Sequence, residues 1–130
     1  MQLPDYYEAD VLRYFDQKPQ EAALYEALFQ RLCDVVPDAS VKVQKSQISF
    51  YGRRLFAAAS IPVRRKKSWP EHCLLVTFGL AFRLDSPRIA VAVEPYPNRW
   101  THHVVIDRPE QLDEELMGWV RDAYDFAQSK

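Results

Sequence analysis

Apolar and polar residues alternate most clearly in the stretch VKVQKSQISFYGRRLFAAASI, which runs from Val41 to Ile61. Residues 47–51 repeat at every second position, a pattern typical of a strand that is buried on one face. Gly52 and Arg53 follow as a short connection, and glycine suits the positive φ of a tight hairpin turn. The stretch therefore predicts a strand, a turn and a returning strand.

The returning strand is expected to cover residues 55–61, with Phe56 on one face and four residues on the other: Leu55, Ala57, Ala59 and Ile61. Three consecutive alanines are unusual in a strand, because alanine is depleted there. They indicate close packing of a helix on that face. A helix over these same residues is the alternative, but Gly52 before them and Pro62 after them leave little room for it.

Three other segments repeat apolar residues at helical spacing. The predicted helices cover residues 5–15 (with Tyr7, Val11, Leu12 and Phe15), 19–36 (with Leu24, Leu28, Leu32 and Val35) and 109–128 (with Leu112, Leu116, Trp119, Val120, Ala123, Phe126 and Ala127). Pro19 and Pro109 fit the first turns of the second and third helices. Acidic residues crowd the start of the last helix, where the helix dipole favours them.

Further strands are predicted over residues 41–45, 74–80 and 100–106. Residues 89–93 remain open, since their β-branched side chains favour a strand while Ser86 could cap a short helix. Residues 62–73, 83–87 and 94–98 are expected to form loops. The chain thus predicts a single α+β domain over residues 1–130, in which N-terminal helices (5–36), an antiparallel meander of about five strands (41–106) and a C-terminal helix (109–128) pack with the helices on one face of the sheet.

Charge is segregated along the 130 residues although the formal net charge is only −1. Residues 1–40 carry eight acidic side chains, residues 41–70 carry none against eight basic ones, and the tail from Asp107 carries seven. No stretch approaches the ~20 apolar residues that a membrane span requires. The first residues show no basic and apolar leader, and the two distant cysteines, Cys33 and Cys73, are expected as free thiols. Both observations favour a cytoplasmic protein without a membrane partner.

His102 and His103 are the first candidates for chemistry. Adjacent residues of a strand point to opposite faces, so these two side chains cannot chelate one metal side by side. No cysteine or carboxylate lies at zinc-like spacing near them, and neither a metal nor a cofactor is expected. One histidine facing a cleft with Arg99 is the functional reading; a packed histidine beside a solvated one is the structural reading.

The basic central segment suggests nucleic-acid binding as one alternative function. It contains Arg53, Arg54, Arg64, Arg65, Lys66 and Lys67. Tyr51, Trp69 and Trp100 are aromatic residues near basic positions, as stacking platforms for single strands would be. Against this, a basic tetrad between strands is more often a solvated loop, and acidic segments flank it on both sides.

An anion-binding cleft is the preferred hypothesis. Lys45, Ser46 and Gln47, with Arg53 or Arg54, could line it together with Arg83, Arg88 and Arg99, because arginine forks match carboxylates and phosphates. The expected ligand-binding residues are Lys45, Tyr51, Arg83, Arg99, Trp100, His102 and His103. The partner would be a small anion or an acidic protein segment. A small enzyme with a histidine as general base is the remaining alternative, although no serine elbow, activated cysteine or glycine-rich phosphate loop supports it.

Four stretches have the character of family signatures: KSQISFYGRRLFA, LDSPRI, VEPYPNRWTHHVVI and LDEELMGWVRDAYDFA. At these words the chain resembles a family of small bacterial proteins that carry a domain of unknown function, either alone or at the C-terminal end of longer proteins. The resemblance covers about residues 15–126. It implies a compact α+β domain, and it supplies no established activity, cofactor or catalytic residue.

Overall fold

The computed structural model describes residues 1–129, which form three α-helices, one 3₁₀ helix and six β-strands. The helices are α1 (Tyr7–Tyr14), α2 (Pro19–Val35), η1 (Pro109–Gln111) and α3 (Glu114–Gln128). The strands are β1 (Ser40–Val43), β2 (Ile48–Tyr51), β3 (Leu55–Ser60), β4 (Leu74–Leu80), β5 (Ile89–Tyr96) and β6 (Arg99–Ile106). The predicted α+β class is confirmed, with one strand more than the approximate number expected.

All six strands pair antiparallel in one sheet, in the order β1-β2-β3-β4-β6-β5. The first four follow the chain as a meander, whereas β6 lies between β4 and β5. β6 pairs with β4 along its length because Val104 and Ile106 extend the apolar face of Val76 and Leu74. The additional strand, β5, is the segment for which strand and helix were both open, and its β-branched residues adopt the strand.

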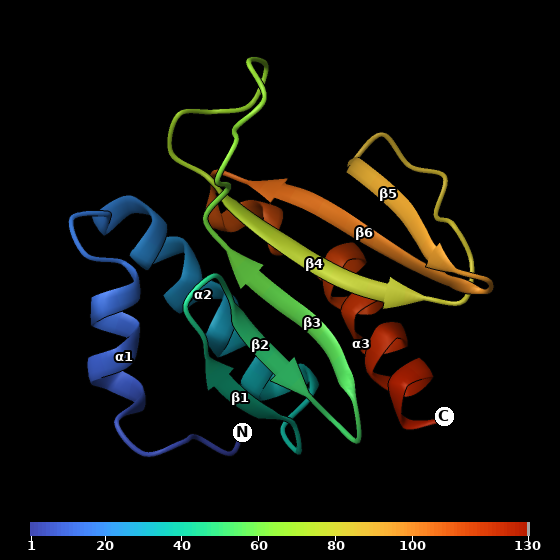
Figure 1. Cartoon of the computed structure of the whole chain (residues 1–130), viewed down its shortest axis with the longest axis horizontal. Helices are drawn as coiled ribbons and strands as arrows, with labels where there is room; N and C mark the ends of the chain where they lie inside the picture. Colours follow the sequence, from blue (N-terminus) through green and yellow to red (C-terminus); the bar gives the residue numbers. More distant parts are fainter. Residues whose placement is uncertain (130) are drawn as a thin grey trace.

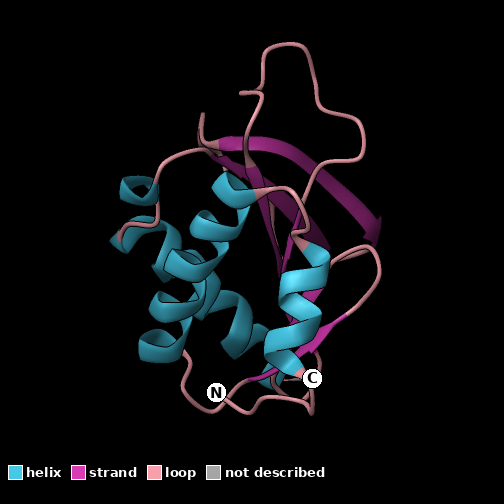
Figure 2. Ribbon diagram, turned by 90° about the vertical axis from the view of Figure 1, so that its left-hand side faces the viewer, coloured by secondary structure: helices cyan, strands magenta, loops and turns pink. Residues whose placement is uncertain are grey.

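The helices lie on one side of the sheet and leave the other side uncovered. Figure 1 looks onto the uncovered face, with α2 and α3 behind the strands and α1 beside the β1 edge. Figure 2, turned by 90°, separates the helical layer from the sheet. The core between the layers includes the helical stripes predicted from spacing, with Leu24, Leu28, Leu32, Leu116, Val120 and Ala123 all buried. Each such leucine contributes about 1.5–3 kcal/mol by leaving water.

A bulge in β3 overturns the predicted position of Phe56. Phe50 lies opposite Ala57 and Tyr51 lies opposite Leu55, so Phe56 is an extra residue in its strand. Its ring therefore turns to the helical side, where it meets the ring of Tyr124 edge-on at a centroid distance of 5.1 Å. A bulge re-aims a side chain in this way because it shifts the alternation by one residue. Ala57 remains on the core side, and α3 packs against β3 as the alanines indicated.

The expectation that Gly52 adopts a positive φ in the hairpin turn is also wrong. No glycine among residues 1–129 has a positive φ. A Cβ at Gly52 would instead collide with the side chain of Gln128, whose Oε1 accepts a hydrogen bond from the Arg53 amide. Glycine at this position therefore leaves room for the end of the Gln128 side chain, which a larger residue would displace.

Several element boundaries differ from those predicted. α1 is shorter, and Leu12 is 76% exposed rather than packed. β5 continues through Tyr96, which reduces the expected 94–98 loop to a two-residue turn with Asn98 in the left-handed region (φ 63°). α3 begins only at Glu114, because the Asp113 side chain accepts the Leu116 amide as an N-cap and Pro109 starts the separate 3₁₀ turn.

Candidate functional site

The uncovered face of the sheet carries a row of small and polar side chains across four strands. Ser49 on β2 lies opposite Ala58 on β3, and Ala58 lies opposite Thr77 on β4. Thr77 in turn lies opposite His103 on β6. Because alternate residues of these strands supply the core, this row must point away from the helices. Because most of these side chains are small, they project little from the middle of the sheet.

A pocket of about 260 Å³ lies on this face where β3 and β4 separate. Their pairing ends at Ala57 and Phe78, and the two strands then diverge (Figure 1). We call this hollow the open-face pocket; its lining includes Gln47, Leu55, Ala58, Thr77, Gly79, Arg99, Thr101 and His103. Two of the predicted ligand-binding residues, Arg99 and His103, therefore meet in one pocket.

His103 is the histidine that faces the open-face pocket. It is half-buried, and its Nδ1 lies 2.8 Å from Thr77 Oγ1. Burial lowers the pKa of His103 below its ordinary value of 6.5, so the ring is neutral at pH 7. Within residues 1–129 its Nε2 makes no hydrogen bond. When Thr77 donates to Nδ1, the ring hydrogen lies on Nε2 and is available to a ligand.

His102 points the other way, as the alternation predicts, and is a structural residue. It is 0% exposed, and its ring stacks on Phe78 at a centroid distance of 5.2 Å. Its Nε2 accepts a hydrogen bond from the Leu84 amide at 3.0 Å, which ties the loop after β4 to β6. Burial lowers the pKa of His102 as well. A side chain enclosed on the core face cannot reach a ligand in the open-face pocket.

Arg99 lies across Gly79 at the mouth of the pocket. A Cβ added to Gly79 would lie 2.8 Å from both Cζ and Nη2 of Arg99, so a side chain at position 79 would displace the guanidinium. The guanidinium carbon also lies 5.9 Å from the ring centroid of Phe126 on α3. Within residues 1–129, no carboxylate oxygen lies within 4 Å of the Arg99 nitrogens. Packing thus positions the charge, and no acid of residues 1–129 pairs with it.

Gln47, the residue before β2, reaches the pocket and belongs to a chain of hydrogen bonds. Its Nε2 donates to Ser49 Oγ at 2.8 Å, and Ser49 Oγ donates to Gln44 Oε1 at 2.5 Å. These contacts satisfy Ser49, which is 0% exposed although it belongs to the uncovered face. They also fix the Gln47 amide at the rim of the pocket.

The pocket residues that were not predicted include Thr77, Gly79 and Thr101. A signal for two of them is present in the strand LLVTFGL, whose only polar side chain is Thr77 and whose only position without a side chain is Gly79. A polar residue and a glycine within an otherwise apolar strand can mark a site where a ligand or another group approaches the sheet closely. Thr101 has no comparable signal.

The other predicted ligand-binding residues do not join the open-face pocket. Lys45 borders a different hollow beside α1. Tyr51 lies under the Lys42 ammonium, with 5.0 Å between Nζ and the ring centroid. Arg83 lies in the loop after β4, with its Cζ 5.9 Å from the Trp100 ring centroid. One cleft containing all seven predicted residues is therefore not present among the described residues.

The basic residues of the nucleic-acid alternative are divided between two places. Arg53 and Arg54 lie in the β2–β3 turn, and the basic tetrad lies in the 61–73 loop that follows the far end of β3 (Figure 1). Six residues of β3 separate the two groups, or about 20 Å at ~3.3 Å per residue. All four side chains of the tetrad are exposed, and Arg65 donates to the Trp69 carbonyl at 2.9 Å.

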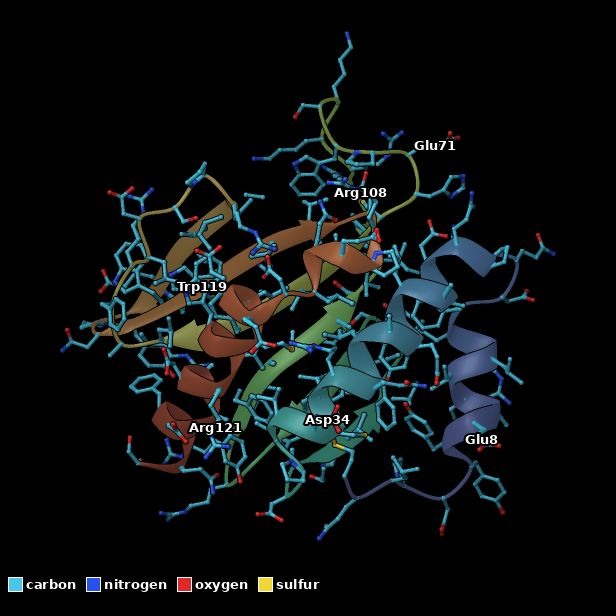
Figure 3. All side chains as sticks on the ribbon, turned by 180° about the vertical axis from the view of Figure 1, so that it is seen from behind. Glu8, Asp34, Glu71, Arg108, Trp119 and Arg121 are labelled. Atoms are coloured by element: carbon cyan, nitrogen blue, oxygen red, sulfur yellow. The ribbon has the colours of Figure 1, made fainter. Side chains whose placement is uncertain are left out.

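Arg88, also considered for anion binding, is occupied by acids of this chain. Its Nη1 lies 2.8 Å from Asp113 Oδ1 and 3.0 Å from Glu115 Oε1. Its Nη2 donates to the Gln111 carbonyl at 2.6 Å, and its Cζ lies 5.8 Å from the Trp119 ring centroid. Figure 3 views the helical side and shows Trp119 between α3 and the β5–β6 end of the sheet. Arg88 therefore joins the start of α3 to the start of β5.

Two further properties bear on the class of site. Among residues 1–129, no three His, Cys, Asp or Glu side chains are grouped so that they could hold a metal ion. Across the same residues, none of the helices has the length and apolar character needed to cross a membrane.

Comparison with protein families extends the resemblance seen in the sequence. The model of one family, described as a domain of unknown function (DUF5655), matches residues 13–127. Comparisons with curated proteins and with solved structures give no match. The matched range contains every residue of the open-face pocket, whereas it begins near the end of α1. The chain belongs to the DUF5655 family of domains of unknown function.

Proposed function

We propose that this chain is a binding module that recognises a small carboxylate or phosphate group in the open-face pocket. The observation that carries the proposal is Arg99, whose guanidinium is held over Gly79 with no carboxylate within 4 Å among residues 1–129. An arginine presents its donors as a planar fork that matches the oxygens of either anion. The same guanidinium could donate to the acidic side chain of a protein partner, which carries the same carboxylate group.

The neighbouring side chains supply the remaining contacts. Gln47, Thr101 and His103 offer neutral donors around the guanidinium, while Leu55 and Ala58 supply an apolar floor. Ligand pockets commonly combine an apolar lining with a few convergent polar groups. A volume of about 260 Å³ is slightly below the usual range for such pockets and suits a compact ligand.

His103 makes the binding dependent on pH. In the free protein burial holds its pKa below 6.5, and an anion placed beside the ring favours the protonated form. The pKa of His103 is therefore higher in the complex than in the free protein. By linkage, anion affinity rises as pH falls through the pKa of the complex and levels off below the pKa of the free protein.

A general base at the same position is the second candidate function. Its specific support is the neutral His103 ring, which lies 2.8 Å from the Thr77 hydroxyl and borders the same pocket as the Arg99 guanidinium. In the tautomer in which Nδ1–H donates to Thr77 Oγ1, the free Nε2 can accept a proton from a bound substrate while the arginine stabilises negative charge that develops on it. His102 has no part in this proposal because it is enclosed in the core.

The free cysteines are in keeping with the cytoplasmic location that we propose for this module. Cys33 and Cys73 form no disulfide, and Cys73 is buried. Nucleic-acid binding receives less support from the geometry, because the two basic groups lie at opposite ends of β3 rather than on one surface. Its signature is an affinity that falls steeply with added salt.

Thermal unfolding in the presence of phosphate, acetate, benzoate, phosphoserine and short oligonucleotides tests the proposal. A ligand that binds only the folded state stabilises it by RT ln(1 + [L]/Kd), about 2.7 kcal/mol at a hundredfold excess over Kd. We expect at least one small anion to raise the unfolding temperature of the wild type. Arg99→Met should weaken that ligand about tenfold or more, as expected for a lost charge-assisted hydrogen bond.

Arg54→Met is the matched control, because Arg54 is exposed in the β2–β3 turn and does not line the pocket. It should leave the shift unchanged. A small-anion shift that survives Arg99→Met, or the absence of any small-anion shift, would refute the proposal. A shift with oligonucleotides alone, lost at higher salt, would assign function to the basic loop instead.

A further inference from the structure

A second hollow lies beside α1 and is separate from the open-face pocket. Its volume is about 680 Å³, compared with about 260 Å³ for the open-face pocket. It lies between the C-terminal half of α1, the β1–β2 turn and the chain that leaves β3, and we call it the α1 pocket. The residues that decide its chemistry are Tyr14, Lys18, Lys45, Ile61 and Val63. The family match begins only at residue 13, so most of the helix that forms one wall precedes the matched range.

Tyr14 fixes the walls of the α1 pocket relative to one another. Its hydroxyl donates to the Ser46 carbonyl in the β1–β2 turn at 3.0 Å and accepts the Ile61 amide after β3 at 3.3 Å. Its ring packs edge-on against Phe15, which is 4% exposed, with 4.9 Å between the ring centroids. One side chain thus joins the helix, the turn and the end of β3 around the hollow.

The floor and the outer wall of the α1 pocket are apolar. Val43 and Ile61 are half-buried beneath it, and Pro62 continues the wall. Val63 is 94% exposed, the most exposed of the large hydrophobic residues on the described surface. These four side chains line the hollow from the end of β1 to the start of the 61–73 loop, and we call them the apolar strip. A ligand with an apolar body would cover them.

The rim of the α1 pocket carries excess positive charge. Its lining holds three cations, Arg13, Lys18 and Lys45, against one carboxylate, Asp10. Arg13 Nη1 pairs with Asp10 Oδ1 at 3.0 Å, which leaves the two lysines without a carboxylate within 4 Å among residues 1–129. The lysines come from opposite sides, Lys18 from the link after α1 and Lys45 from the β1–β2 turn.

We propose that the α1 pocket binds an amphiphilic carboxylate. Its alkyl or aryl body would lie on the apolar side chains Val43, Ile61, Pro62 and Val63, and its carboxylate would lie between Lys18 and Lys45. An apolar wall alone would suit many ligands, and two unpaired lysines alone would suit any anion. Together they select a molecule with one charged end and one apolar end, because each part then leaves water for a matching surface. The ligand differs from the compact anion of the open-face pocket in needing an apolar body.

Calorimetric titration of the full chain with decanoate, below the concentration at which it forms micelles, tests this inference. Decanol and acetate serve as ligands that lack the charge or the apolar body. We expect decanoate to bind with one-to-one stoichiometry and more tightly than either of them. Lys45→Gln and Val63→Ser each remove one exposed group from the pocket and should each weaken decanoate about threefold to fivefold.

Two control variants separate this site from other surfaces. Lys67→Gln removes an exposed lysine of the 61–73 loop that does not line the pocket, and Arg99→Met alters the open-face pocket. Both should leave decanoate binding unchanged. The inference is overturned if decanoate does not bind, if Lys45→Gln and Val63→Ser have no effect, or if Arg99→Met abolishes binding. The last result would assign decanoate to the open-face pocket, so failure here is distinguishable from failure of the proposed function.

Discussion

Replacement of Arg88 by methionine distinguishes an arginine that holds the fold from one that is free to bind. Arg88 and Arg99 both belong to the arginines that the sequence offered for an anion site. The structure gives Arg88 two carboxylates, a backbone carbonyl and an aromatic ring, whereas Arg99 lies beside the ring of Phe126 and has no carboxylate within 4 Å among residues 1–129. Methionine keeps much of the apolar stem of the side chain and removes the charge and the donors. Arg88→Met should therefore lower the free energy of unfolding much more than Arg99→Met does.

The magnitude follows from the contacts of Arg88. Its side chain is 24% exposed while Asp113 and Glu115 are 48% and 55% exposed, so the two ion pairs are screened and contribute about 0.5 kcal/mol each. The hydrogen bond to the Gln111 carbonyl contributes about 1 kcal/mol and the Trp119 contact about 0.5 kcal/mol. We expect Arg88→Met to lower the free energy of unfolding by about 2–3 kcal/mol.

The same contacts predict a dependence on pH. The hydrogen bond from Arg88 lowers the pKa of Asp113 below its ordinary value of 3.8, with help from the Leu116 amide. A carboxylate with a lower pKa in the folded state stabilises the fold above the unfolded value, and this contribution is lost as pH falls through the folded value. The wild type should therefore lose stability below about pH 4. The Arg88→Met variant should lose less stability than the wild type as the pH falls below about 4.

Urea unfolding followed by tryptophan fluorescence measures both effects, since Trp119 lies directly beside Arg88. Arg83→Met is the matched control, because Arg83 is exposed, lies beside the Trp100 ring and forms no ion pair within residues 1–129. It should change stability by less than about 0.5 kcal/mol. An Arg88→Met variant as stable as wild type, or an Arg83→Met variant equally destabilised, would show that the pairing around α3 does not carry the stability assigned to it.

Two other substitutions test the assignment of the histidine and glycine on β6 and β4. Gly79→Ala should change the free energy of unfolding by less than about 1 kcal/mol, because the φ of Gly79 is not positive and only the end of the Arg99 side chain must move. The displaced guanidinium should weaken small-anion binding about tenfold. An unchanged affinity in titration calorimetry would contradict this. His102→Ala should cost about 2–4 kcal/mol through a cavity and the lost Leu84 hydrogen bond. Because burial lowers the pKa of His102, the wild type should also lose stability as pH falls below about 6.5. Amide exchange should quicken at Leu84 in the variant, and unchanged protection there would reject the assigned contact.

Local patterns were sufficient wherever one residue type dictates one local geometry. The apolar run LLVTFGL gave β4 with its observed ends, and the leucine spacing gave α2 from Pro19. The period of a strand also separated the two histidines, since neighbours on a strand must face opposite sides. It could not say which one faces the core. That choice depends on the pairing of Phe78 with His102, which places both rings under α3.

Phe56 shows where local pattern fails. In an uninterrupted strand, Phe56 and Ala57 would point to different faces of the sheet. The extra residue at the bulge instead turns Phe56 toward Tyr124 on the helical side. The reason lies in α3, more than fifty residues later in the chain. The same holds for Gly52, whose lack of a side chain leaves room for Gln128 and is not needed for a positive φ in the turn.

The sequence by itself determined the α+β class, the three helices, most strands and the residue types suited to an anion. Each of these depends on periodicity or on the chemistry of single side chains, which a chain carries in its order. Tertiary structure decided which arginine remains unpaired, because Arg88 meets Asp113 and Glu115 only once α3 packs beside β5. It also decided that Arg99 and His103 share a pocket while Lys45 lies in another. Pairing across a sheet joins residues far apart in sequence, and no local pattern records that pairing.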